Sequence, residues 1–161
     1  LAVAACVAVA VGVVVDGLGL TSDPAIRASG DCTRFDSGRY GRSIRLESVQ
    51  NAIDQAKVVA RAIVDEVAPY DPVPWFWSDQ HDVKLQITGL STGYDMSVRR
   101  GDTSEKSFSV FYLRDKILLA VDSVNRPRDH MLARRLIGAR LRSDMSVLAD
   151  PTSALDVDFQ I

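Results

Sequence analysis

Apolar residues between positions 47 and 66 recur at spacings of three and four, which is the pattern of an amphipathic helix. The stripe that they form consists of Val49, Ala52, Ile53, Ala56, Ala60 and Ile63. The opposite face carries Asp54, Lys57, Arg61 and Asp65 at the same spacings, with opposite charges at 54/57 and 61/65, and Ser48 is the expected N-cap. We therefore predict a helix over residues 47–66 whose apolar stripe lies on a core.

Shorter apolar runs ahead of this helix predict two buried strands. A β-branched run over residues 12–16 gives the first, and residues 26–29 give the second, which ends at Gly30 and Asp31. Residues 1–9 are small and apolar and are expected to finish a helix. Residues 32–44 are expected to form a loop.

Three prolines between positions 69 and 74 stop the long helix and enforce an extended path. We place a domain boundary there, so the predicted organisation is one part over residues 1–72 and another over 73–161. Beyond the boundary the hydrophobic period changes from helical spacing to alternation, which predicts strands. The four expected strands cover residues 83–87, 96–98, 108–112 and 117–124.

Short turns join these strands, which makes an antiparallel meander the economical topology. A helix is expected to begin at Pro127, with apolar residues at helical spacing as far as Leu141, and a short helix is expected over residues 144–149. Helices and an antiparallel sheet together make the predicted fold class α+β.

Composition excludes several classes of protein. With 47% hydrophobic and 25% charged residues in a chain of 161, the sequence is globular rather than disordered. A net charge of −2 gives no overall field that would attract nucleic acid or a membrane surface, so neither is expected as a partner. Two cysteines cannot build a disulfide framework, and His81 and His130 lack further ligands at metal-binding spacing. No metal site is expected.

The first fifteen residues are almost wholly apolar, as in a targeting segment. No Lys or Arg precedes the run, it is shorter than the roughly 20 residues of a membrane helix, and no cleavage site is clear. We therefore expect neither a signal peptide nor a membrane anchor, and we expect a reducing cytoplasmic location. Because the run looks like part of a buried element, we also expect the chain to be a fragment that lacks its N-terminal part.

The segment over residues 21–31 carries the first candidate for binding chemistry. It reads Thr-Ser-Asp-Pro-Ala-Ile-Arg-Ala-Ser-Gly-Asp. Gly30 lets a ligand approach the backbone, and the carboxylate of Asp31 can bind sugar-like hydroxyls. The helix that begins at Ser48 and Val49 offers N–H groups and a positive dipole end, which suit a ring that gains negative charge. Taken alone, Gly-Asp is usually a turn and a capped helix is often a surface element.

These motifs resemble those of FAD-dependent ferredoxin reductases of the putidaredoxin and rhodocoxin reductase type. Residues 45–52, Arg-Leu-Glu-Ser-Val-Gln-Asn-Ala, look like the segment that follows Gly-Asp-Cys in that family. Residues 74–80, Pro-Trp-Phe-Trp-Ser-Asp-Gln, are similar to the signature that opens its C-terminal domain. On composition alone such aromatic residues would equally fill an interdomain core. The likeness extends from about Gly12 to Met131, which makes it more specific than any single motif.

The resemblance implies that residues 1–72 are the closing segment of an FAD-binding domain and that residues 73–161 are the reductase C-terminal domain. It implies a cofactor-binding role for Gly30 and Ser48, for Asp31 on the ribityl chain of FAD, for the backbone around Val49 on the isoalloxazine, and for Trp77 beside the flavin. The chemistry belongs to the flavin, so no catalytic residue is expected. Because no Gly-x-Gly-x-x-Gly motif occurs, the NAD(P)H site is expected outside this fragment.

The implied activity moves electrons from NAD(P)H through FAD to a [2Fe-2S] ferredoxin that serves an oxygenase such as a cytochrome P450. Basic residues over positions 27–45, with Lys57 and Arg61, are expected to form a rim that steers an acidic ferredoxin. One alternative keeps the fold and changes the acceptor to a rubredoxin or a dioxygenase ferredoxin. The other is a non-catalytic interaction or dimerisation module. The sequence does not decide whether the protein is a homodimer, or whether it uses NADH or NADPH.

Overall fold

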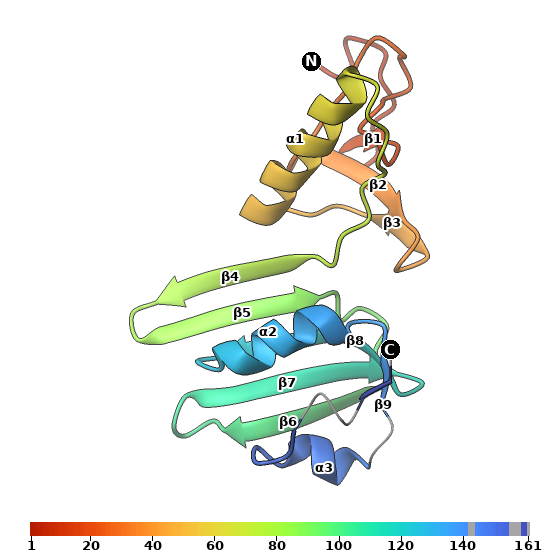
Figure 1. The fold of residues 1–161 in the computed structure, drawn as a ribbon. Helices are drawn as coiled ribbons and strands as arrows, with labels where there is room; N and C mark the ends of the chain where they lie inside the picture. Colours follow the sequence, from red (N-terminus) through yellow and green to blue (C-terminus); the bar gives the residue numbers. More distant parts are fainter. Residues whose placement is uncertain (142–143, 155–158, 161) are drawn as a thin grey trace. The chain divides into compact units, whose positions relative to one another are not determined.

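Figure 1 shows the computed structural model of the chain, which describes residues 1–141, 144–154 and 159–160. The chain separates into two compact units, Leu1–Pro72 and Val73–Ile161. Each unit has its own secondary structure, which is described separately below. Helices and strands occur in both, so the predicted α+β class is confirmed.

The first unit combines a small sheet with one long helix. Its strands are β1 (Val13–Val15), β2 (Thr33–Ser37) and β3 (Arg42–Ile44), in that order, with β1 parallel and β3 antiparallel to β2. The helix α1 (Val49–Ile63) follows, and it is the helix predicted over residues 47–66. Ser48 caps it as predicted, because its hydroxyl accepts a hydrogen bond of 3.1 Å from the backbone N–H of Asn51.

Three local expectations for this unit are wrong. Residues 1–9 form turns rather than the end of a helix. Residues 26–29 form no strand, since only Arg27 makes an isolated bridge, to Leu20. The expected loop over residues 32–44 instead contains β2 and β3. The alternation in β2 is carried by Thr33, Phe35 and Ser37, of which only one is large and apolar, so the hydrophobic signal for a strand is weak.

The face of α1 that is buried is also not the predicted one. The residues that it buries are Gln50, Asn51, Gln55 and Ala62. The predicted apolar stripe is exposed, with Val49 at 53%, Ile53 at 49% and Ile63 at 67%. Helical spacing shows that an apolar stripe exists, but it does not show which side of the helix is covered. Here the buried polar contacts of the opposite side determine the orientation of the helix.

The second unit is built on an antiparallel sheet of five main strands. These are β4 (Trp75–Gln80), β5 (Val83–Gly89), β6 (Met96–Asp102), β7 (Ser107–Arg114) and β8 (Ile117–Val124). The neighbours run β4, β5, β8, β7, β6 across the sheet. All four predicted strands are therefore confirmed, and β4 is an additional edge strand. The predicted meander is wrong at one pair, because β8 pairs with β5 and so separates β5 from β6.

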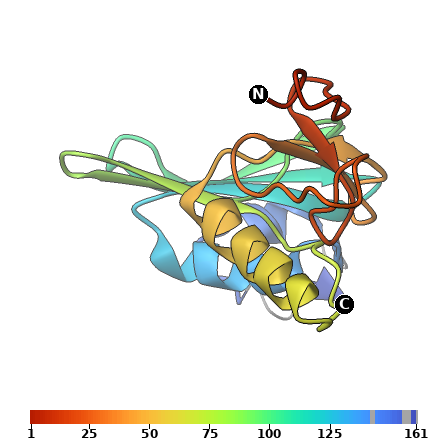
Figure 2. The same ribbon diagram turned by 90° about the horizontal axis from the view of Figure 1, so that it is seen from above.

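Two helices cover one face of this sheet. The helix α2 (Pro127–Leu136) begins at the proline as predicted, and α3 (Met145–Ala149) is the predicted short helix. Both helices lie on the same side of the sheet (Figure 2). The apolar core that they form with the sheet includes Val98, Phe111 and Val121. The helix α2 ends before Leu141, which instead lies in the short strand β9 (Arg140–Leu141), paired with β8 and with β10 (Phe159–Gln160).

A buried arginine fixes the chain that follows α3. Arg100 on β6 is only 3% exposed, and its guanidinium donates hydrogen bonds to the backbone carbonyls of Pro151 at 3.2 Å and Ser153 at 2.7 Å. Its Nε lies 3.8 Å from the carboxylate of Asp129, which also accepts hydrogen bonds from Arg126 at 2.6 Å and Ser109 at 2.9 Å. The core of the second unit is therefore partly polar, with its charges paired.

Candidate functional site

The Gly-Asp turn lies against the buried side of α1. The backbone N–H of Gly30 donates a hydrogen bond of 2.7 Å to Oε1 of Gln55, and the hydroxyl of Thr33 lies 2.8 Å from the same oxygen. Gly30 is buried and has φ of +82°, a conformation that favours glycine. A single side-chain oxygen of α1 thus fixes both ends of the turn, although Gln55 stands 25 residues later in the chain.

Asp31 is the exposed residue of this turn. Its backbone carbonyl accepts a hydrogen bond of 2.9 Å from Arg45, whose guanidinium also pairs with Glu47 at 3.0 Å. The carboxylate of Asp31 itself makes no hydrogen bond or ion pair with the described residues. The structure therefore holds the backbone at Asp31 and leaves the carboxylate available to a ligand.

The beginning of α1 is fixed by a second buried amide. Asn51 is fully buried, and its Nδ2 donates a hydrogen bond of 2.9 Å to the carbonyl of Leu46. Its own N–H binds the capping hydroxyl of Ser48, which leaves the N–H of Val49 without a partner among the described residues. Gly30 and Asp31 thus lie in a turn held by α1, and Ser48 and Val49 begin that helix. The Asp31 carboxylate and the Val49 N–H are the groups there without a partner among the described residues.

Trp77 belongs to the second unit, on the edge strand β4. Its indole is 37% exposed and stacks on that of Trp75, with ring centroids 5.3 Å apart and planes at 28°. The guanidinium of Arg134 lies 4.9 Å from the ring centroid of Trp75. An exposed indole backed in this way offers a flat surface to a planar ring.

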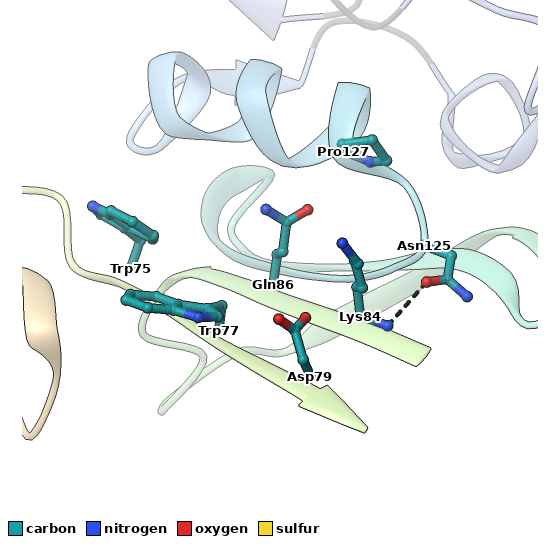
Figure 3. A pocket seen from close by; sticks show the side chains of 7 residues that line it. All are labelled: Trp75, Trp77, Asp79, Lys84, Gln86, Asn125 and Pro127. Carbon is teal, nitrogen blue, oxygen red and sulfur yellow. Dashed lines mark hydrogen bonds between the residues drawn. The ribbon is translucent and has the colours of Figure 1, made fainter. Parts of the chain in front are cut away.

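The two tryptophans line a hollow of about 570 Å³ in the second unit, shown in Figure 3. Its other lining residues are Asp79, Lys84, Gln86, Asn125 and Pro127. The backbone N–H of Lys84 donates a hydrogen bond of 2.9 Å to the side chain of Asn125, which holds β5 to the segment before α2. The hollow combines an aromatic wall with both signs of charge.

Several residues of these sites were outside the sequence prediction. Gln55 and Arg134 do not belong to any recognised motif, and each acts by contact with a residue far along the chain. The signal that could have found Gln55 is the set of uncharged amides at positions 50, 51 and 55, which share one side of the helix. Arg134 has no comparable signal, because its contact depends on how α2 packs on the sheet.

The predicted basic rim divides into two groups. Arg27, Arg34 and Arg45 donate hydrogen bonds to Leu18, Ser43 and Asp31, so these three guanidinium groups have structural partners. Lys57 also has a partner, since its Nζ lies 3.6 Å from the carboxylate of Asp54. The exposed side chains of Arg39, Arg42 and Arg61 have no hydrogen-bond or ion-pair partner among the described residues. The three partnerless side chains are the ones available to an acidic partner.

Membrane-spanning helices and metal sites are two further features, considered over the described parts of the chain. No helix there is long and apolar enough to cross a membrane. Within the same residues, no group of three or more His, Cys, Asp or Glu side chains is placed to hold a metal ion.

Comparison with known proteins gives a consistent family. A family model described as reductase C-terminal matches residues 75–157. Putidaredoxin reductase of Pseudomonas putida is 43% identical over 144 residues, which are 89% of this chain and 34% of that reductase. The chain therefore spans about a third of the length of this curated relative.

Comparison with solved structures gives the same family. The ferredoxin reductase for the CYP199A2 system from Rhodopseudomonas palustris has a TM-score of 0.85 and 44% identity, over 97% of this chain and 39% of that one. A reductase chain in the covalent putidaredoxin reductase–putidaredoxin complex has a TM-score of 0.86 and 44% identity, over 93% of this chain and 36% of that one. The resemblance inferred from the motifs is confirmed.

Replacing Gln55 by methionine tests the contact that holds the turn. Methionine keeps the length of the side chain but removes the acceptor, so the Gly30 N–H loses its buried partner. The Thr33 hydroxyl keeps a partner, because it also lies 2.8 Å from the carbonyl of Gly30. We expect the free energy of unfolding to fall by about 1–3 kcal/mol, measured by urea denaturation, because this is the cost of one buried unpaired donor. The same change at the exposed Gln80 should cost far less, and equal losses at both positions would contradict this role of Gln55.

The buried His130 predicts a pH dependence of stability. Its Nδ1 lies 2.9 Å from the hydroxyl of Thr88, and burial, with a smaller effect of Arg134, lowers the pKa of His130 below its ordinary value. The unfolded chain then binds a proton that the folded chain does not. We expect the free energy of unfolding to fall as the pH is lowered from about 7 towards 5.

Urea denaturation at a series of pH values measures this effect. His130→Gln should remove that part of the pH dependence, whereas His81→Gln, at an exposed position, should leave it unchanged. A pH dependence that survives His130→Gln in full would show that another group is responsible.

Proposed function

Because this chain belongs to the reductase C-terminal family, we propose that it forms part of an FAD-dependent oxidoreductase that passes electrons from NAD(P)H to a [2Fe-2S] ferredoxin. In this proposal residues 1–72 close the FAD-binding domain and residues 73–161 are the C-terminal domain. The observation that supports it best is the turn at Gly30 and Asp31, which is held rigidly by Gln55 and yet presents a carboxylate with no described partner.

The residues of this turn fit FAD by their donor and acceptor chemistry. The Asp31 carboxylate would accept hydrogen bonds from ribityl hydroxyls, and Gly30 would allow the chain of the cofactor to approach the backbone. The helix start at Ser48 and Val49 would stabilise the negative charge of a reduced ring through its N–H groups and dipole. When bound, FAD supplies hydride acceptance and one-electron release, while the protein orients and tunes it.

Trp77 is proposed as the contribution of the second unit to the flavin site. Trp77 is 37% exposed and its indole stacks on that of Trp75, whose ring Arg134 contacts in turn, so it can pack on a planar ring without large rearrangement. NAD(P)H would bind to a part of the protein beyond residues 1–161, since no Gly-x-Gly-x-x-Gly motif is present here.

The proposed electron acceptor is an acidic ferredoxin that serves an oxygenase such as a cytochrome P450. The similar chains of known structure include one captured with putidaredoxin and one from a CYP199A2 system. Arg39, Arg42 and Arg61 would steer such a partner, because their charges are not neutralised by the described residues. We propose a cytoplasmic location, which suits two exposed cysteines that form no disulfide.

The flavin proposal is tested in the longer natural polypeptide that contains residues 1–161. The purified protein should absorb as a flavoprotein and should bleach with NADH or NADPH under anaerobic conditions. Asp31→Ala should weaken FAD binding about 10- to 100-fold, because a charged acceptor is worth about 1.5–3 kcal/mol. Asp36→Ala, at an exposed carboxylate on β2, is the matched control. A colourless protein that ignores added FAD would overturn the proposal in favour of an interaction module.

The steering proposal is tested by reversing two charges. Arg39→Glu with Arg42→Glu should slow ferredoxin reduction by about three- to tenfold at low salt, and the difference should shrink as added salt shortens the screening length. Arg99→Glu with Arg114→Glu makes the same change in net charge at exposed positions of the second unit. Stopped-flow ferredoxin reduction measures both, and equal rates for the two double variants would contradict a specific rim.

A further inference from the structure

His130 is a buried imidazole beside the two tryptophans of β4. It lies on α2, is 3% exposed, and meets the ring of Trp75 edge-on with the ring centroids 6.0 Å apart. Trp75 in turn carries the indole of Trp77, stacked at 5.3 Å (Figure 3). The position of Trp77 therefore depends on a series of contacts that begins at His130.

The sheet anchors this imidazole with one hydroxyl. Thr88 on β5 is fully buried, and its Oγ1 lies 2.9 Å from Nδ1 of His130. Thr88 is also the cross-strand partner of Trp75 on one side and of Val121 on the other. A neutral imidazole forms this hydrogen bond in either tautomer, because Nδ1 can accept or donate. The histidine ring is thus fixed between uncharged residues of the sheet.

The charges near His130 lie on its own helix. Arg126 and Arg134 stand four residues before and after it, and Asp129 stands next to it. The carboxylate of Asp129 already pairs with Arg126 at 2.6 Å, and the guanidinium of Arg134 lies 4.9 Å from the ring centroid of Trp75. Burial, and to a smaller extent Arg134, lower the pKa of His130. A proton on His130 would therefore bring a second cation to an indole that already has one.

We propose that His130 is a positioning residue for a planar ligand: the neutral imidazole holds the Trp75–Trp77 stack, and its protonation weakens the packing of that ligand on Trp77. The inference rests on the proposed function in one respect, which is that the ligand is the flavin. Protonation makes both ring nitrogens donors, so the hydroxyl of Thr88 must then accept, and the new charge is repelled by the guanidinium over the same indole. Proton binding and ligand binding then oppose each other by the same factor.

The stack itself can be observed without flavin, because Trp75 and Trp77 are the only tryptophans in the sequence. Two stacked indoles give an exciton couplet in the circular dichroism spectrum. We expect the couplet of the 161-residue chain to lose about half of its amplitude or more as the pH is lowered from about 7 towards 5. The pH is lowered only as far as the amide signal stays constant, which separates loosening of the stack from unfolding.

Three variants identify the group responsible. His130→Gln keeps a side chain that can bond to Thr88 but does not titrate, so the couplet at pH 7 should remain and its pH dependence should disappear. Thr88→Val removes the anchor and should weaken the couplet at every pH. His81→Gln, at an exposed position, should keep the original profile.

A couplet that does not change with pH, or a pH dependence that survives His130→Gln, would overturn the inference. If His130→Gln does not fold, Thr88→Val tests the same contact, and an unchanged couplet in that variant would overturn it equally.

The effect on the flavin is measured in the longer natural polypeptide. The dissociation constant of FAD should rise about three- to tenfold as the pH is lowered from about 7 towards 5, and His130→Gln should remove most of this rise. A couplet that follows His130 while FAD affinity does not would remove Trp77 from the flavin site, and so would contradict the ligand named here rather than the hold on the stack. If the polypeptide binds no FAD, the proposed function fails and the couplet alone decides the inference.

Discussion

The first unit depends on one buried oxygen, Oε1 of Gln55. It accepts the N–H of Gly30 and contacts the hydroxyl of Thr33, and so it joins α1 to the Gly-Asp turn and to the first residue of β2. Because a buried donor without a partner costs about 1–3 kcal/mol, this contact fixes the rotation of the helix about its axis. The rotation in turn sets which side of α1 faces the sheet and where Ser48 places the helix start. The available carboxylate of Asp31 and the outward apolar stripe are both consequences of it.

The second unit uses a comparable arrangement to hold its aromatic surface. Thr88 on β5 contacts His130 on α2, and the ring of His130 meets that of Trp75 edge-on at 6.0 Å. Asp129, next to His130, ties the same helix to β7 through Ser109. Polar contacts across the sheet–helix interface therefore fix Trp75, on which Trp77 stacks. An indole supported in this way loses little conformational entropy when a planar ligand packs on it.

Local signals in the sequence predicted what is locally determined. Ser48 caps α1 and Pro127 begins α2 because a hydroxyl or a fixed φ acts on the residues next to it. The strand over residues 117–124 is predicted correctly because it is long, apolar and buried. The pairing of β5 with β8 and the orientation of α1 were beyond such signals, since each is decided by residues 25 or more positions apart. The motif resemblance identified the family, because motifs in one order along the chain carry information that single spacings lack.

The helix α1 also connects the turn and the helix start physically. Its first turn lies beside Gly30, where FAD is proposed to bind. A ligand that binds only when the turn and the helix are both ordered stabilises both of them by linkage. A flavin bound at this place is therefore expected to raise the free energy of unfolding of the first unit.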